Sequence, residues 1–187
     1  ASFFLITSAL REVREVFRQT IKFQEEMLEV QKFLPSGENV GSLRAEAYKI
    51  AAITGNPIDT VLGSYTEFAK QGKKSQEILD FTKVALMGVN VASTDFKTTV
   101  TYLTTATNVW KDETKDLIGL IDKLAIVQAK SSASSEVLIS AMQRSASMAK
   151  TMGISQDQLF GYISAVSEKT QLSGEVIGTS LRTIFSR

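Results

Sequence analysis

The feature that most restricts the fold of this chain is a run of apolar residues at helical spacing over its first 34 residues. One row repeats every three or four residues, and a second row repeats every seven. The spacing predicts one amphipathic helix of about 50 Å over residues 2–34, which Pro35 and Gly37 end. Three polar residues interrupt the rows, which disfavours a regular coiled coil. The first row contains Phe3, Ile6, Leu10, Val13, Phe17, Met27 and Leu34, the second Val16, Phe23 and Val30, and the interruptions are Thr20, Gln24 and Gln31.

After Pro35 the pattern changes to helices of about 12–18 residues, which begin at capping residues and end near Gly or Asn. Asn56 is predicted to cap a helix that has Pro57 as its first residue and Asp59 in its first turn. This helix is predicted to end by Gly72. Ser155 and Gln158 form a capping box. The chain is therefore predicted to be all-α, with a long helix in residues 1–36 and a compact domain of short helices in residues 37–187, truncated at its C-terminal end. Weaker helix starts are Ser93, Asp112, Ser131–Ser135 and Ser173.

Six threonines between Thr98 and Thr107 leave a β-strand as an alternative for that segment. We expect a helix, because Phe96, Val100 and Trp110 follow helical spacing and a lone strand would lack a pairing partner.

Composition restricts function. The net charge is +1, from 21 basic and 20 acidic residues, so the chain lacks the positive field of a nucleic-acid binder and no sequence-specific contact with nucleic acid is expected. There is no Cys and no His, which removes thiol nucleophiles, most zinc sites and the commonest general base. We therefore expect no catalytic residue, no metal and no cofactor.

The sequence predicts neither a membrane-spanning helix nor a signal peptide. The charge-free stretches are shorter than the ~20 apolar residues that a membrane-spanning helix needs. Ala1–Leu10 lacks a preceding basic region and a clear cleavage site, so it indicates a helix cut by a fragment boundary rather than a signal peptide.

Two patterns resemble catalytic chemistry, and for both we prefer a structural interpretation. Ser147 and Lys150 match S-x-x-K, but the companion motifs of that enzyme class are absent. Carboxylates cluster in two places, where neighbouring Lys residues indicate solvated helix surfaces rather than a hydrolase pair. The clusters are Glu25, Glu26 and Glu29, and Asp112, Glu113 and Asp116.

Three patterns indicate packing or contact surfaces. Gly174 and Gly178 lie four residues apart, which predicts close approach of another helix. Met142, Met148 and Met152 form a stripe that we interpret as core, with an adaptable binding surface as the alternative. A basic stripe on the first helix could contact phosphates or acidic partners, but interleaved Glu12 and Glu15 favour a solvated surface. The stripe consists of Arg11, Arg14, Arg18 and Lys22.

The two apolar rows of the first helix predict self-association. Together they cover more than one side of the helix, so a single neighbour cannot bury both. Either one row contacts the chain's own domain and the other a second copy, or several copies form a ring. The predicted self-association surface contains Phe3, Leu10, Phe17, Val16, Phe23 and Val30.

Several runs of this sequence closely resemble the core region of phage tail tape measure proteins. The resemblance covers about Gly41–Arg187, and the first helix resembles the segment that precedes that core. The runs that carry it are Ala141–Lys150, Gly153–Ser155 with Leu159, Thr170–Gly178, Ser180–Arg187, Tyr65–Gly72 and Ala52–Gly55.

The resemblance implies a longer parent protein that sets tail length inside the tail tube and leaves ahead of the DNA at ejection. It also implies a virion tail location, assembly in the host cytoplasm and no enzymatic activity. The implied partners are a few copies of the chain itself, tail tube and tail tip or baseplate proteins, tail assembly chaperones and, at ejection, the host membrane. A membrane-active or channel-forming module is the first alternative, and a cell-wall lytic enzyme is the second.

Overall fold

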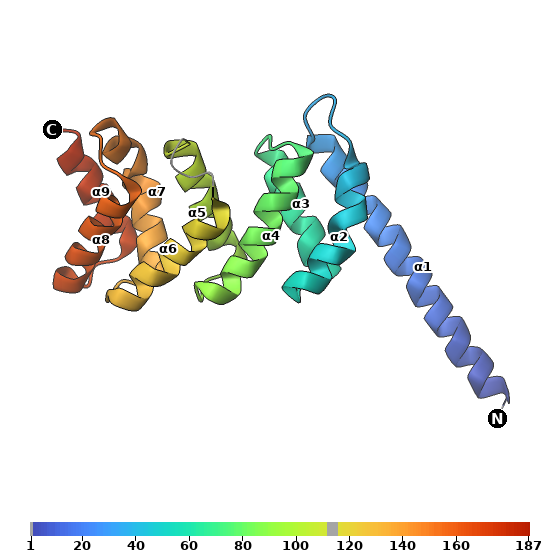
Figure 1. The fold of residues 1–187 in the computed structure, drawn as a ribbon. Coiled ribbons are helices and arrows are strands. Elements are labelled where there is room, and N and C mark those ends of the chain that lie inside the picture. The colour runs from blue at the N-terminus through green and yellow to red at the C-terminus, as the bar shows by residue number, and fades with distance from the viewer. Residues whose placement is uncertain (1, 112–115) are drawn as a thin grey trace. The chain divides into compact units, whose positions relative to one another are not determined.

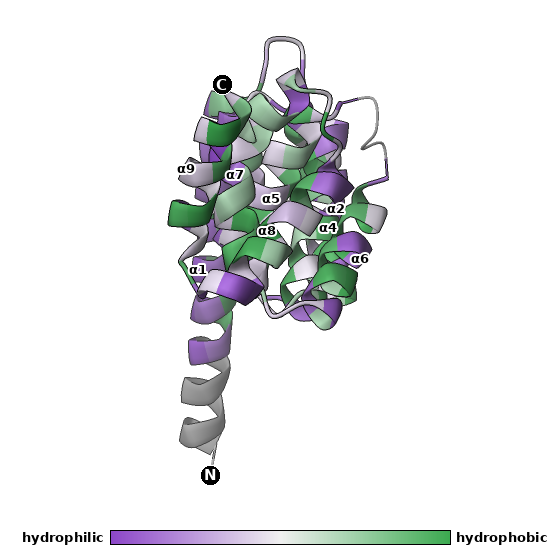
Figure 2. Cartoon of the chain, turned by 90° about the vertical axis from the view of Figure 1, so that its left-hand side faces the viewer, coloured by the Kyte–Doolittle hydropathy of each residue, from purple (hydrophilic) through white to green (hydrophobic). Residues whose placement is uncertain are grey.

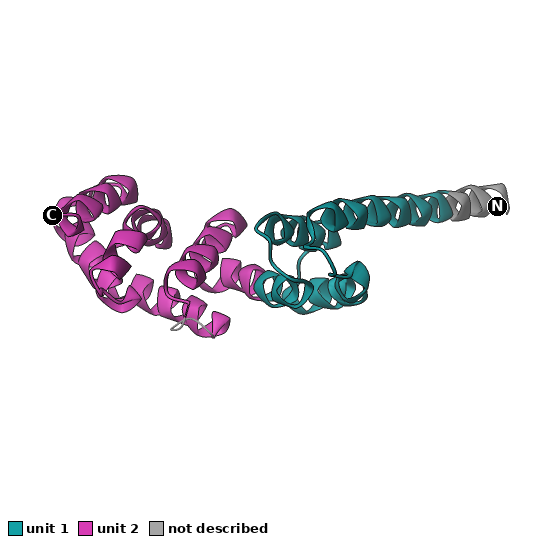
Figure 3. Cartoon of the chain, turned by 90° about the horizontal axis from the view of Figure 1, so that it is seen from above, with its two compact units in different colours: residues 1–83 teal, residues 84–187 magenta. Residues whose placement is uncertain are grey.

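A computed structural model describes residues 2–111 and 116–187, with side chains described from residue 11 onward. Over these ranges the chain forms nine α-helices and no strand, which confirms the all-α class (Figure 1). The chain divides into two compact units, residues 1–83 and 84–187 (Figure 3). The helices are α1 (Ser2–Phe33), α2 (Val40–Thr54), α3 (Ile58–Lys70), α4 (Ser75–Val91), α5 (Phe96–Val109), α6 (Leu117–Lys130), α7 (Ser135–Thr151), α8 (Gln156–Thr170) and α9 (Gly174–Phe185).

Unit 1 contains α1, α2, α3 and the first part of α4. Helix α3 contacts both α1 and α2, and its buried side chains form much of the core of this unit. Phe68 meets Phe81 of α4 edge to face, with ring centroids 5.3 Å apart. The start of α4 is fixed by Glu38, whose carboxylate accepts a 2.8 Å hydrogen bond from the Ser75 amide. The two units are defined by contacts between residues and do not test the predicted domain boundary at residue 36. That boundary stays a prediction.

Unit 2 contains the rest of α4 and the helices α5 to α9. Helix α7 is its centre, because it contacts α5, α6, α8 and α9. Each of these helices carries both hydrophobic and hydrophilic residues, as amphipathic packing requires (Figure 2). The hydrophobic side of α7 is formed by small and medium side chains, which let its neighbours approach closely. Its fully buried members include Leu138, Ala141, Met142 and Ala149.

A buried hydrogen-bond network links α5 to α6 and α8 in unit 2. The Tyr102 hydroxyl donates to the Leu120 carbonyl at 2.8 Å and accepts from the Gln156 side-chain amide at 2.8 Å. Burial raises the pKa of Tyr102, so the phenol stays protonated and continues to donate. Trp110, which is fully buried, donates its indole N–H to the Ile154 carbonyl at 3.2 Å. These bonds satisfy polar atoms that would otherwise be costly to bury.

The predicted capping box is confirmed at the start of α8. The Ser155 hydroxyl accepts from the Gln158 amide, and the Gln158 side chain accepts from the Ser155 amide. Two predicted details of α3 are wrong by one residue. Pro57 occupies the N-cap position rather than the first helical position, because its carbonyl accepts the first helical amide bonds. The Asn56 side chain does not cap the helix but donates to the Thr54 carbonyl.

The weaker starts are partly corrected. Helix α5 is capped by Asp95 rather than by Ser93, because the Asp95 carboxylate accepts from both the amide and the hydroxyl of Thr98. Asp112 lies outside the described residues, and α6 begins after Asp116, whose carboxylate accepts from the Gly119 amide at 3.0 Å. Ser134 caps α7 through the Val137 amide, and Ser173 precedes α9 without a side-chain bond.

The threonine-rich segment is helical, as expected: α5 covers Thr98–Thr107. Three of its hydroxyls bond to the backbone, since Thr99, Thr101 and Thr107 each donate to the carbonyl four residues earlier. The methionine stripe of α7 is only partly buried. Met142 is in the core, Met148 is half-buried and Met152 is 60% exposed. Met152 follows the last helical residue, so it leaves the buried side of the helix.

Candidate assembly site on helix α1

The C-terminal part of α1 packs against the rest of unit 1. Met27 and Val30 are fully buried, and α1 contacts both α3 and α2. One turn earlier, the ring of Phe23 stacks on Tyr48 of α2, with centroids 5.2 Å apart and planes 19° from parallel. One side of α1, formed by Phe23, Met27 and Val30, is therefore covered by its own unit.

The preceding part of α1 has no cover within unit 1. Each residue from 11 to 20 is exposed, including Val13, Val16 and Phe17. Phe17 is 65% exposed, and two further apolar side chains of α1, Ile21 and Leu28, are 57% and 55% exposed. At 100° per residue, Val13, Phe17, Ile21 and Leu28 lie on one side of the helix. These four residues are called the exposed row.

The structure separates the six residues of the predicted self-association surface. Phe17 lies in the exposed row and Val16 is exposed beside it. Phe23 is half-buried against Tyr48, and Val30 is buried in the core of unit 1. Val30 must therefore be removed from the predicted surface, because α2 and α3 pack against this end of α1. The side chains of Phe3 and Leu10 lie outside the described residues.

Sequence reasoning missed Ile21 and Leu28. Ile21 follows Phe17 by one helical turn and Leu28 follows Ile21 by two turns, so helical periodicity contained the signal. The polar residues Thr20 and Gln24, which interrupt this apolar spacing, hid the signal.

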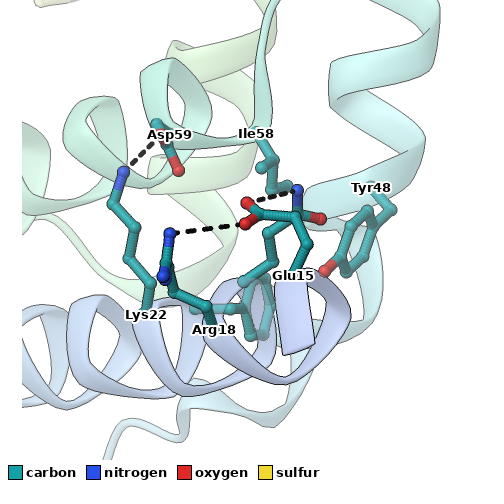
Figure 4. A pocket seen from close by; sticks show the side chains of 8 residues that line it. Glu15, Arg18, Lys22, Tyr48, Ile58 and Asp59 are labelled. Atoms are coloured by element: carbon teal, nitrogen blue, oxygen red, sulfur yellow. Dashed lines mark hydrogen bonds and ion pairs between the residues drawn. The ribbon is translucent and has the colours of Figure 1, made fainter. Parts of the chain in front are cut away.

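A groove lies between α1 and the helices α2 and α3 (Figure 4). Its volume is about 390 Å³. Lys22 forms an ion pair with Asp59 of α3 and a second one, at 3.7 Å, with Glu26 of its own helix. Arg18 pairs with Glu15 at 3.4 Å. The lining residues are Glu15, Arg18, Gln19, Lys22, Phe23, Tyr48, Ile58 and Asp59.

The electrostatics of this groove indicate attachment of α1 rather than proton-transfer chemistry. The hydrogen bond to Asp59 raises the pKa of Lys22, which keeps the ammonium charged. Burial raises the pKa of Glu26, one of whose carboxylate oxygens has no hydrogen-bond partner. Exposed ion pairs of this kind contribute little to stability, so they orient α1 more than they stabilise it. Arg11 and Arg14, the other members of the basic stripe, are exposed.

The two glycines predicted to allow close packing lie against the backbone of α7. A Cβ atom at Gly174 would stand 2.4 Å from the Val137 carbonyl oxygen, and one at Gly178 would stand 2.4 Å from the Ala141 carbonyl oxygen. The two glycines and the α7 residues that they contact advance in the same direction along the chain, so α7 and α9 run parallel. The contact is internal to unit 2.

The patterns that resembled catalytic chemistry are found on helix surfaces. Ser147 and Lys150 are exposed on α7. Glu29 pairs with Lys32 at 2.7 Å, and hydrogen bonding to Lys32 lowers the pKa of Glu29. In the second carboxylate cluster only Asp116 is described, and its carboxylate caps α6. Among the described residues, no group of three acidic side chains is arranged to hold a metal ion.

The hydropathy of the helices adds one further observation. In the part of the chain that the structure describes, no helix is both long enough and apolar enough to cross a membrane.

Over the residues that the structure describes, the fold is all-helical, and its first helix carries an exposed apolar row beside paired surface charges, which is typical of a contact-forming structural protein. Comparison with known families specifies this class. Residues 44–187 match the family of phage-related minor tail proteins, and the chain belongs to that family. Membership indicates a structural component of a virion tail and suggests a non-enzymatic protein. No solved structure matches the chain.

Proposed function

We propose that this chain is part of a tape measure protein, which sets tail length during assembly and leaves the tail ahead of the DNA. Family membership supports a tail role, and the resemblance of Ala141–Lys150 and Thr170–Gly178 to the tape measure core supports the finer assignment. The proposed partners are copies of the chain, tail tube and tip or baseplate proteins, and assembly chaperones. Assembly would take place in the host cytoplasm.

The observation that carries this proposal is the exposed row of α1. Apolar side chains that stay more than half exposed along several turns of one helix are typical of a protein interface. Burying four such side chains against a second copy would contribute about 1.5–3 kcal/mol each before the cost of association. A parallel set of copies would bring equivalent rows together, which is one arrangement that the symmetry of homo-oligomers allows.

Self-association is tested by placing charges in the exposed row. The double variant Phe17→Glu with Ile21→Glu should lower the oligomeric state in sedimentation and leave the helical circular dichroism unchanged, because neither side chain is in the core. Phe23→Glu is a poor choice, since Phe23 stacks on Tyr48 within unit 1. Ala45→Glu with Ala52→Glu adds the same charge at exposed positions of α2 and serves as the matched control.

Two outcomes contradict the self-association proposal. One is that the unsubstituted chain is monomeric at about 100 μM, a concentration well above the dissociation constants of specific oligomers. The other is equal loss of association in the control variant, which would indicate a general effect of charge.

Tail-length control is tested in the virus that encodes the chain. An insertion of about 20 residues into the extended helical part of the parent protein should lengthen the tail by roughly 30 Å, because a helix rises 1.5 Å per residue. An unchanged tail length in electron micrographs would refute the tape measure assignment while leaving the tail family intact.

A membrane-active role is the second candidate, and one observation favours it. The exposed row lies beside Arg11 and Arg14, which is an arrangement that interfacial helices share. Co-sedimentation with vesicles that contain anionic lipid, compared between the parent chain and the Phe17→Glu and Ile21→Glu variant, separates membrane binding from self-association.

A further inference from the structure

The parallel helices α7 and α9 of unit 2 form a hollow on their outer side. Its volume is about 500 Å³, and it is lined by Gln143, Arg144, Ser147, Met148 and Arg182. The glycine contacts at Gly174 and Gly178 hold the two helix backbones together, so the spacing of the two arginines across the hollow is set by the fold. This set of five residues is called the arginine hollow.

The arginine hollow has two cationic groups and no acidic residue in its lining. Arg144 donates one N–H to Glu175 of α9 at 2.5 Å, which orients its guanidinium. A guanidinium has five N–H donors, so most of those of Arg144 remain available. In the described part of the chain, no carboxylate forms an ion pair with Arg182, which is exposed. Positive charge in this hollow is therefore only partly neutralised by the protein itself.

The chemistry of the lining matches carboxylates. Guanidinium groups bind carboxylates through paired, charge-assisted hydrogen bonds, which are stronger than neutral ones. The side chains of Gln143 and Ser147 are also exposed and supply uncharged donors beside the two arginines. Half-buried Met148 offers an adaptable apolar contact for the methylene groups of an acidic side chain.

We propose that the arginine hollow binds carboxylates of an acidic protein segment, and thus forms a second contact site separate from α1. A protein segment is favoured over nucleic acid because the net charge of +1 gives no long-range positive field for a phosphate backbone. The site depends only on unit 2, so it does not rest on the tape measure assignment.

The test measures binding of a labelled oligoglutamate peptide to the full chain by fluorescence anisotropy at low salt. An oligoglutamine peptide of the same length is the uncharged control probe. We expect oligoglutamate to bind about tenfold more tightly than oligoglutamine, and Arg182→Gln to weaken oligoglutamate binding by about fivefold. Ser147→Glu should weaken it by at least as much, because it places a carboxylate inside the hollow without removing an arginine.

Arg44→Gln is the matched control variant, because Arg44 is an exposed arginine of α2 outside the hollow. It should leave binding within about twofold of the parent chain. The proposal is overturned if Arg44→Gln weakens binding as much as Arg182→Gln, or if both peptides bind equally. Tighter binding of duplex DNA than of oligoglutamate, with the same dependence on Arg182, would also overturn it by showing that the ligand is a phosphate backbone.

Discussion

Gly178 of α9 lies directly against Ala141 of α7, with the space for a Cβ atom already occupied by the Ala141 carbonyl group. A methyl group at this position would stand 2.4 Å from a backbone oxygen, which no side-chain rotation can relieve. The closeness of α7 and α9, and with it the core of unit 2, therefore depends on the absence of a side chain at residue 178.

Gly178→Ala should destabilise unit 2 by about 3 kcal/mol, because the helices must separate to admit the methyl group. The fluorescence of the single tryptophan, Trp110, reports the unfolding of this unit in a denaturant titration. Gly161→Ala is the control, since nothing lies within 4 Å of its added Cβ. It should stabilise α8 by about 0.5–1 kcal/mol through the higher helix propensity of alanine. Equal effects of the two substitutions would contradict the packing argument.

Trp110→Ala should lower the free energy of unfolding by about 3–5 kcal/mol, since the ring is fully buried. Trp110→Phe keeps most of the volume but removes the N–H that donates to Ile154, and we expect a loss of about 1–2 kcal/mol. Far-UV circular dichroism during denaturation measures both, because these variants lack the fluorescent probe. A loss below about 1 kcal/mol for Trp110→Ala would contradict its burial.

Two buried tyrosines should respond oppositely to removal of their hydroxyl groups. Tyr102→Phe removes the hydrogen bond to the Leu120 carbonyl and takes away the acceptor of the buried Gln156 amide, and it should cost about 1–3 kcal/mol. Tyr65 is also fully buried, but its hydroxyl has no hydrogen-bond partner among the described residues. Tyr65→Phe should therefore be neutral or stabilising in thermal and chemical unfolding. A large loss for Tyr65→Phe would reveal a partner for its hydroxyl.

The Asp95 cap of α5 should make stability depend on pH. Hydrogen bonds from Thr98 lower the pKa of Asp95 below its value in the unfolded chain. A lowered pKa contributes stability above the unfolded-state pKa, and this contribution is lost as the pH falls through the folded-state pKa. Asp95→Ala should cost about 1 kcal/mol at neutral pH. The difference between parent and variant should shrink in strongly acidic solution, and a difference independent of pH would contradict the ionised cap.

The sequence by itself determined those helix starts and ends that depend only on neighbouring residues. The capping box of Ser155 and Gln158 and the helix end near Gly72 act within one or two turns, so neighbouring residues suffice to define them. The helical state of Thr98–Thr107 likewise followed from the spacing of its apolar residues. The sequence did not determine a helix start where several capping residues compete. Asp95 caps α5 in place of the predicted Ser93, because its carboxylate accepts from two donors of Thr98.

Only the tertiary structure decided which apolar residues of α1 are buried. Val30 and Phe17 both belong to apolar rows of one helix, yet Val30 is buried and Phe17 is 65% exposed. The difference arises because α2 and α3, which are distant in sequence from α1, pack against its C-terminal part and leave residues 11–20 exposed. The arginine hollow has the same origin, since Arg144 and Arg182 meet only because Gly174 and Gly178 allow α9 to lie against α7. Helical periodicity defines the sides of a helix, whereas the long-range packing of other helices selects the side that remains available for a partner.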